Sequence, residues 1–352
     1  MLTASARVVA VVVTHNRKEL LLSCLEALAQ QRSPVAAVVI VDTASSDGTA
    51  DALRSAGIAG RLPVRLLRLA RNGGGAEGFH YGIAAALEQR SDWLWLMDDD
   101  CEPSPDTLEQ LLSSRPAAHA ATALLAPTVV AGDGRVLPLN RGRVRARWAF
   151  APLVALAEAE HDGPEREIGF CTFVGPLIRT EAAREAGLPM REMFIRNDDV
   201  EYCLRLAGPG RMWLVPASVI VHYDPTPFVR ADSLGARLRE FSSPPSLAGE
   251  WKHLYALRNL LFAARRHRIL NAAQALSFAA IQVTRRLLVG ERRLRGGLLA
   301  AAYAYDGMRG RFRNVPPQTW NDVVVARRPL RELDARALRY DRDVRERDEQ
   351  LA

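Results

Sequence analysis

Three consecutive aspartates, Asp98, Asp99 and Asp100, follow the apolar run Trp93–Met97. This run predicts a buried strand, because strands of parallel sheets are apolar on both faces. Three adjacent carboxylates repel one another unless a cation neutralises them, and their oxygens suit Mg²⁺ or Mn²⁺. The triplet therefore indicates a metal site. The alternative is a solvated acidic turn before a helix that starts near Pro103–Asp106.

Three other strands are expected to end in polar residues. The first hundred residues alternate between two patterns, which predict strands at 8–13, 35–41, 64–69 and 93–97 and helices at 18–29, 48–55 and 75–88. Such alternation predicts an α/β fold with a doubly wound, mainly parallel sheet, whose ligands bind beyond the carboxyl ends of the strands. The polar residues at those ends are Thr14–Asn16, Asp42–Gly48, Arg71–Gly75 and Asp98–Asp100. We expect all four groups to lie along one edge of the sheet.

The later part of the chain is expected to contain fewer strands and more helices. The patterns predict a helix at 107–126, a strand at 168–178, a helix starting at Asp198 and Asp199, a strand at 213–221 that ends at His222, and a helical region at 251–290. The composition changes near Pro225, and Pro244–Pro245 indicates a linker.

Composition limits the class of protein. The 352 residues are 48% hydrophobic, enough for one large domain with an appendage. The net charge of +7 reflects many arginines and hardly any lysines, and the arginines form clusters that attract the phosphates of nucleotides, anionic lipids or nucleic acids. No nucleic-acid-binding motif accompanies them, so nucleic acid is not an expected partner. Those clusters are Arg141–Arg147, Arg265–Arg268 and Arg292–Arg295.

The location of the protein is predicted from what the sequence lacks. No secretory signal is recognised, and the four cysteines are too far apart for a paired metal site, so a reducing, cytoplasmic setting is expected. The apolar stretch 269–283 is too short and too polar to span a membrane. It predicts either a helix on a membrane surface or a helix packed on the catalytic domain, and both interpretations stay open.

Each remaining candidate has a functional and a structural interpretation. Asp42 is suited to accept a hydrogen bond from a base or ribose, or to cap a turn. The loop Arg71–Gly75 offers an arginine and backbone N–H groups to an anion, although a glycine-rich loop alone is weak evidence. His222 is a candidate third metal ligand or a structural histidine. Asp198 and Asp199 are suited to act as a general base or to cap a helix.

The ordered set of motifs resembles family-2 glycosyltransferases of the GT-A fold, from about Val8 to Asp224. The matching segments are Val11–Asn16, Val41–Thr49, the DxD-type Asp98–Asp100, the acidic helix start Asp198–Arg205 and His222. Within that family, three segments look most like bacterial galactofuranosyltransferases, with rhamnosyltransferases second. Those segments are Arg71–Phe79, Trp93–Asp100 and Phe194–Asp199.

The resemblance implies an inverting transfer from a nucleotide-diphosphate sugar with Mg²⁺ or Mn²⁺. It implies that Asp199, rather than Asp198, is the catalytic base, and that Asp98, Asp100 and His222 hold the metal. Asp42 would contact the nucleoside. The full set implied for the nucleotide sugar is Thr14, Asn16, Asp42, Arg71, Asn72, Gly75, Asp98 and Asp99.

The resemblance also implies partners and a domain organisation. The donor would be a UDP- or dTDP-sugar, and the acceptor a saccharide, polyprenyl-linked, at the cytoplasmic face of the inner membrane. The stretch Trp251–Asn259 resembles the Tyr-x-x-Arg-Asn stretch of members that use lipid acceptors. Residues 1–230 would form the catalytic domain, divided into a nucleotide-binding half (1–100) and an acceptor half (101–230). Residues 231–352 would form a basic, helical region with access to the membrane, and self-association is left open.

Two other functions compete with this interpretation. A sugar-phosphate nucleotidyltransferase also uses a parallel sheet and Mg²⁺, but it would carry a glycine-rich, basic loop after the first strand. This chain has Thr14–Arg17 there instead. A non-catalytic nucleotide-sugar-binding module would not need the full set of carboxylates.

Overall fold

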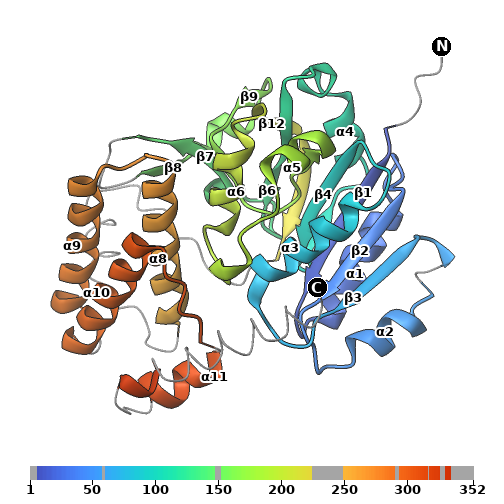
Figure 1. The fold of residues 1–352 in the computed structure, drawn as a ribbon. Helices are drawn as coiled ribbons and strands as arrows, with labels where there is room; N and C mark the ends of the chain where they lie inside the picture. Colours follow the sequence, from blue (N-terminus) through green and yellow to red (C-terminus); the bar gives the residue numbers. More distant parts are fainter. Residues whose placement is uncertain are drawn as a thin grey trace. The chain divides into compact units, whose positions relative to one another are not determined.

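The computed structural model describes residues 6–57, 60–146, 152–223, 249–289, 293–315, 317–325 and 330–333. The chain divides into two compact units (Figure 1). The first, here the sheet unit, comprises residues 1–145, 153–191 and 198–228, and the second, the helical unit, comprises 146–152, 192–197 and 229–352. The linker expected at Pro244–Pro245 lies outside the described residues.

The sheet unit is built on a mixed, mostly parallel sheet, which confirms the predicted α/β class. Among the described residues this sheet has nine strands, with the path β3-β2-β1-β4-β11-β6-β12-β5 and β9 paired to β12. The strands are β1 (Val8–Thr14), β2 (Ala37–Asp42), β3 (Val64–Arg68), β4 (Trp93–Asp98), β5 (Cys101–Pro103), β6 (Thr122–Val130), β9 (Arg166–Glu167), β11 (Leu177–Arg179) and β12 (Arg211–His222). Strands β1 to β4 are parallel, and β11 runs antiparallel between β4 and β6. A second sheet has the order β10-β7-β8, with β7 at Arg141–Val144, β8 at Leu153–Ala155 and β10 at Phe170–Cys171.

Helices cover both faces of the large sheet, so its central strands are apolar on both sides. Val9, Val11 and Val13 of β1 belong to one hydrophobic cluster, whereas the alternate residues of the same strand belong to the other. The first cluster includes residues of α3 (Gly74–Leu87), α5 (Thr180–Ala186) and α6 (Asp198–Leu206). The second includes residues of α1 (Lys18–Ala29) and α4 (Thr107–Ser113). Helix α2 (Thr49–Ser55) follows β2.

The helix predicted at 107–126 is wrong beyond its first two turns. Helix α4 ends at Ser113, a 3-10 turn covers Arg115–Ala118, and Thr122–Val130 is the strand β6. Ser114 is extended, with a ψ of 148°, and so ends α4. The residues of β6 are buried on both faces, where pairing with β12 and β11 outweighs the helix propensity of alanine and leucine.

Two other predicted elements are interrupted. The strand expected at 168–178 is divided into β10 and β11, with Gly175 at a positive φ of 77° between them. The helical region expected at 251–290 is two helices, α8 (Glu250–Arg266) and α9 (Ala272–Val289), separated where Arg268 adopts a φ of 57°. In both places a left-handed residue ends the regular element.

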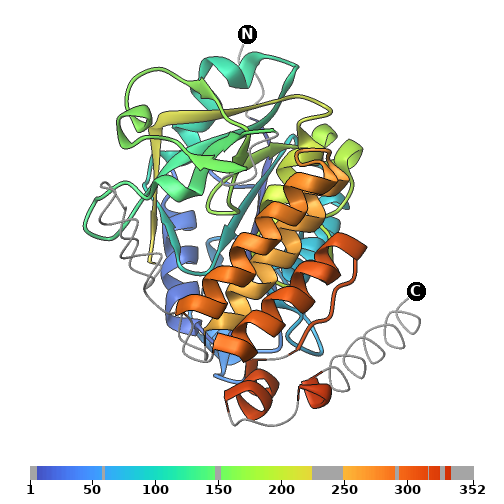
Figure 2. The ribbon, with the colours of Figure 1, turned by 90° about the vertical axis from the view of Figure 1, so that its left-hand side faces the viewer.

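The helical unit contains three longer helices that pack together. Helix α10 (Arg293–Arg309) contacts both α8 and α9, and the three lie side by side in Figure 2. A short helix α11 (Pro317–Trp320) and a π-helical turn at Asn321–Val325 follow. None of the described helices combines the length and the apolar character that a membrane crossing requires.

Helix α3 packs unusually close to the sheet because glycines face it. A Cβ at Gly82 would lie 2.4 Å from Val11 Cγ1 and 3.0 Å from Val41 Cγ2. A Cβ at Gly78 would lie 2.4 Å from Val13 Cγ1. This approach brings the N-terminus of α3 down towards the carboxyl ends of β1 and β2.

We expect Gly82→Ala to lower the free energy of unfolding by about 1–3 kcal/mol, because the added methyl overlaps two valines of the sheet. Urea unfolding midpoints measure the change. Gly75→Ala in the same helix is the control. A Cβ there meets nothing within 4 Å, so stability should stay the same or rise by up to about 1 kcal/mol. A Gly82→Ala protein as stable as the wild type would contradict the close packing.

Candidate active site

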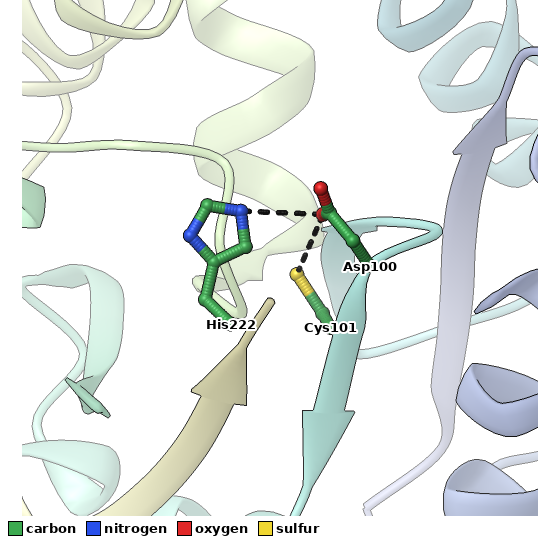
Figure 3. A group of neighbouring side chains, drawn as sticks. All are labelled: Asp100, Cys101 and His222. Atoms are coloured by element: carbon green, nitrogen blue, oxygen red, sulfur yellow. Dashed lines mark hydrogen bonds and ion pairs between the residues drawn. The ribbon is translucent and has the colours of Figure 1, made fainter. Parts of the chain in front are cut away.

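Strand pairing brings His222 to the aspartate triplet. After β4 ends at Asp98, the chain turns through Asp99 and Asp100 into β5, which pairs antiparallel with the end of β12. Cys101 lies opposite His222 in this pairing. As a result His222 Nε2 lies 3.2 Å from Asp100 Oδ1 (Figure 3).

Asp100 and His222 form the part of the site whose chemistry fits a divalent metal. Their ligand atoms and Cys101 Sγ all lie within 4.8 Å of one another, which makes this the cluster in the described part of the chain best suited to an ion. Cys101 is fully buried, and burial raises the pKa of its thiol well above the usual value, so the sulfur stays protonated. A carboxylate and an imidazole remain as possible ligands, of which the carboxylate suits Mg²⁺ or Mn²⁺ and the imidazole suits a transition metal.

Asp98 lies close to this pair but is not one of the three clustered residues. No described group donates a hydrogen bond to its carboxylate. Burial raises the pKa of Asp98 well above its usual value, and the charges of Asp100, Asp99 and Asp198 raise it further. A bound cation would stabilise the ionised form of a carboxylate that accepts no hydrogen bond and lies beside other carboxylates.

Asp99 is held by the end of β1. Thr14 Oγ1 donates to Asp99 Oδ2 at 2.7 Å, and the His15 N–H donates to the same oxygen at 3.3 Å. Burial raises the pKa of Asp99 to about 6 in spite of these hydrogen bonds. Thr14 and Asp99, both predicted to bind the nucleotide sugar, are therefore brought together, and their contact joins β1 to the turn after β4.

Arg17 is a site residue that the sequence interpretation missed. Its Nη1 lies 2.5 Å from Asp100 Oδ2 and 3.3 Å from Asp99 Oδ1. Burial alone would raise the pKa of Asp100, but the hydrogen bond from His222 and the positive charge of Arg17 lower it below its usual value. The only signal in the sequence is the position of Arg17, directly after the polar end of the first strand.

The ends of β1 and β2 are linked by side chains. Asn16 N–H donates to Ser45 Oγ at 2.8 Å, and Asn16 Oδ1 accepts from the Ser46 N–H at 2.7 Å. Asp42 Oδ1 accepts from the Ser45 N–H at 2.8 Å. The second oxygen, Asp42 Oδ2, is buried and accepts no hydrogen bond within the described residues, although Arg68 Nε lies 3.5 Å away. It is available to a donor on a ligand.

The loop that precedes α3 is fixed by its own side chains. Asn72 Oδ1 accepts from the Gly74 N–H at 2.8 Å, and Arg71 Nη2 donates to Glu77 Oε1 at 2.7 Å. Leu69 N–H donates to Asp42 O, so this loop begins beside the end of β2. The predicted binding residues Arg71, Asn72 and Gly75 thus lie on the same edge of the sheet as Asp42.

The acidic helix start lies at the N-terminus of α6, as predicted. Asp198 is buried, and burial followed by the charge of Asp199 raises its pKa well above the usual value. Asp199 is half-buried, and its Oδ1 accepts from the Val200 N–H at 2.7 Å. Asp198 is also close enough to Asp98 to raise the pKa of that residue, so α6 contributes to the same acidic edge.

Comparison with known proteins identifies the family. The family model described as Glycosyl transferase family 2 matches residues 9–183. The galactofuranosyltransferase GlfT1 of Mycolicibacterium smegmatis is 31% identical over 213 residues, which cover 59% of this chain and 68% of that protein. This chain belongs to glycosyltransferase family 2. The GlfT1 of Mycobacterium tuberculosis is 34% identical over 209 residues, covering 58% of this chain and 65% of that protein. The family-2 chain thus spans about two thirds of these curated relatives.

The fold of this family-2 glycosyltransferase agrees with solved structures. The crystal structure of GalNAc-T7 with UDP, GalNAc and Mn²⁺ superposes with a TM-score of 0.52 at 16% identity, covering 80% of this chain and 58% of that one. At this identity the likeness concerns the fold, and it confirms the expected GT-A architecture.

Proposed function

We propose that this glycosyltransferase moves a sugar from a nucleotide-diphosphate sugar to a hydroxyl of a lipid-linked or cell-surface saccharide, with inversion at the anomeric carbon. Galactofuranose is the first candidate for the sugar and rhamnose the second. The observation that carries the proposal is the placement of Asp100 beside His222 at the end of β4, in a chain whose relatives are named galactofuranosyltransferases. UDP or dTDP is the proposed nucleotide.

The proposed division of labour follows the two halves of the sheet. Residues 1–100 bind the donor, with the nucleoside at Asp42 and the nucleotide sugar along the strand ends and the loop before α3. Residues 101–230 supply the acceptor side and the base, and residues 231–352 form the basic, helical region. The remaining donor-binding residues in this proposal are Thr14, Asn16, Arg71, Asn72, Gly75, Asp98 and Asp99.

The proposed reaction is a single displacement. Asp199 takes the proton of the acceptor hydroxyl as its oxygen attacks the anomeric carbon from the face opposite the diphosphate. The new glycosidic C–O bond forms while the C–O bond to the diphosphate breaks, and the diphosphate leaves with the electron pair. Asp198, the buried neighbour of Asp199 at the start of α6, is the second candidate for the base.

Asp98, Asp100 and His222 are the proposed ligands of Mg²⁺ or Mn²⁺. When bound there, the cation would supply positive charge against the diphosphate. Arg17 already places a guanidinium on Asp100, so it holds that carboxylate ionised and ready to act as a ligand.

Release of nucleoside diphosphate from a panel of UDP-, dTDP- and GDP-sugars tests the proposal, and release from none of them would remove it. We expect Asp199→Asn to lower kcat by about 10²- to 10⁴-fold, because the base is lost while the shape is kept. Asp133→Asn, an exposed position in the same unit, is the control and should leave kcat unchanged. Activity of Asp199→Asn within a few-fold of the wild type would exclude Asp199 as the base.

We expect calorimetric titration to detect Mn²⁺ binding by the wild type. Asp100→Asn and His222→Ala should each weaken that binding at least about 10-fold, a loss typical even of residues that only orient a ligand. Chelation should abolish turnover, and added Mn²⁺ or Mg²⁺ should restore it. Equal Mn²⁺ affinity in the wild type and both variants would place the metal elsewhere.

We further propose that the helical unit meets an anionic membrane on the cytoplasmic face, where a polyprenyl-linked acceptor is embedded. Helix α9 contains no acidic residue, and Asp306 of α10 is buried and paired with Arg313. Both helices expose large apolar side chains while carrying arginines such as Arg285, Arg293 and Arg309. The exposed apolar residues of the two helices are Leu276, Leu287, Leu288, Leu294, Leu298 and Tyr305.

We expect the protein to co-sediment with vesicles of phosphatidylglycerol and phosphatidylcholine, and less with phosphatidylcholine alone. Leu294→Gln with Leu298→Gln should weaken vesicle binding more than 10-fold, at roughly 2 kcal/mol for each leucine removed from the lipid. The control is Leu139→Gln in the sheet unit, because Leu139 is 54% exposed and Leu298 is 55% exposed. Equal sedimentation of all three proteins would rule out this surface.

A further inference from the structure

The segment that leads into α6 has a strained backbone. Phe194, Arg196 and Asn197 have φ values of 67°, 66° and 60°, although none of them is glycine. Left-handed conformations of this kind cost about 1–2 kcal/mol for each residue and persist where the surroundings enforce them. The catalytic helix start, Asp198 and Asp199, follows this segment directly.

One buried side chain holds much of this left-handed segment in place. Asn259 of α8 is fully buried, and its Nδ2 donates to the carbonyl oxygens of Met193, Ile195 and Arg196 at 2.9, 3.1 and 2.8 Å. These residues and α8 belong to the same compact unit. A single amide therefore gathers three carbonyl groups of the left-handed segment around one point.

Arg258 fixes the orientation of that amide. Its Nε donates to Asn259 Oδ1 at 2.9 Å, so the nitrogen of Asn259 must face the three carbonyl oxygens. Arg258 is itself fully buried, and its Nη2 donates to Met193 O at 3.1 Å. Its Nη1 donates to Arg313 O and to Asn314 Oδ1, both at 3.0 Å.

The rest of the Tyr-x-x-Arg-Asn stretch and its neighbours complete the network. Tyr255 accepts from the Val315 N–H at 2.6 Å, and its ring lies 5.7 Å from that of Phe194. Asn197 Nδ2 donates to Ala256 O at 3.0 Å. Since Tyr255, Arg258 and Asn259 are spaced i, i+3 and i+4, they share one face of α8 and act on one segment.

We propose that Asn259, oriented by Arg258, is a positioning residue that sets the catalytic base, a role that rests on the proposed function of Asp199. Asn259 holds the backbone of residues 193–196, and the peptide bond between Asn197 and Asp198 transmits that position to the start of α6. A general base must lie within about 3 Å of the proton it takes, and a misplacement of about 1 Å costs on the order of 100-fold in rate. The spacing of Tyr255, Arg258 and Asn259 in α8 therefore serves the geometry of the base rather than contact with a lipid.

The test compares full-length wild type with Asn259→Ala, and with Asn259→Ser, which keeps one donor and is used if the alanine variant does not fold. Arg286→Met is the control, because it breaks a buried ion pair of α8 and α9 with Glu250 and lowers stability without touching residues 193–197. Hydrogen exchange of the 198–206 peptide and the kcat and KM of nucleoside diphosphate release are measured on the sugar that the wild type turns over.

We expect the Asn259 variants to exchange faster across 198–206 and to lose at least about 10-fold in kcat, with the donor KM within about 3-fold of the wild type. Arg286→Met should change neither the exchange nor kcat. Unchanged exchange across 198–206, or a wild-type kcat in a destabilised Asn259 variant, would overturn the positioning role. Absence of turnover by the wild type would instead remove the proposed function, and the exchange measurement would still decide whether Asn259 orders the start of α6.

Discussion

Crowding of negative charge at the end of β4 is the constraint on which the site depends. Two like charges 4 Å apart repel by about 4 kcal/mol at an effective dielectric constant near 20. Asp198 adds a fourth carboxyl group close to Asp98, Asp99 and Asp100. Two side chains from other strand ends contact these carboxylates and offset the repulsion. Arg17 reaches the triplet from the loop after β1, and His222 reaches it from the end of β12. Both contacts are needed, because without Arg17 the carboxylate of Asp100 would lose its ion pair with a guanidinium, and without His222 it would lose its contact with the imidazole.

The register of the parallel strands and the close packing of α3 bring the polar strand ends to one edge of the sheet. Val13 of β1 lies beside Asp98 of β4, and Thr14 lies beside Asp42 of β2, so the polar residues after these strands emerge at one height. The glycines of α3 allow that helix to approach β1, which places its N-terminal loop above the same edge. Side chains then join the loops to one another, as when Thr14 binds Asp99 and Asn16 binds Ser46. The site is pre-organised by contacts between loops that are far apart in sequence.

The spacing of apolar residues along the sequence predicts the first helix and the strands near it. The helix 18–29 was predicted with its observed bounds, and the strands around it within a few residues, because their apolar spacing and their burial agree. The prediction failed at Thr122–Val130, where the preference of alanine and leucine for helix is overridden by pairing with β12. The contact of His222 with Asp100 depends on the pairing of β5 with β12, across more than a hundred residues, and no spacing in the sequence reports it. Arg17 escaped notice because one arginine after a strand forms no pattern.

The arginines show why residue type alone is a poor guide to ligands in this chain. Their number and clustering predicted surfaces that attract phosphate, yet Arg141, from the first cluster, is fully buried. It donates to the carbonyl oxygens of Pro127, Asn140 and Val174 at 2.7–2.9 Å. Arg258 serves backbone carbonyls in the same way. A guanidinium has five donors in a fixed plane, so it can satisfy several carbonyls where the backbone leaves regular structure. Arg17 differs because its partners are carboxylates at a strand end. The partner that each arginine meets, rather than the net charge of +7, separates arginines that hold the backbone, such as Arg141 and Arg258, from Arg17, which contacts the carboxylates of the site.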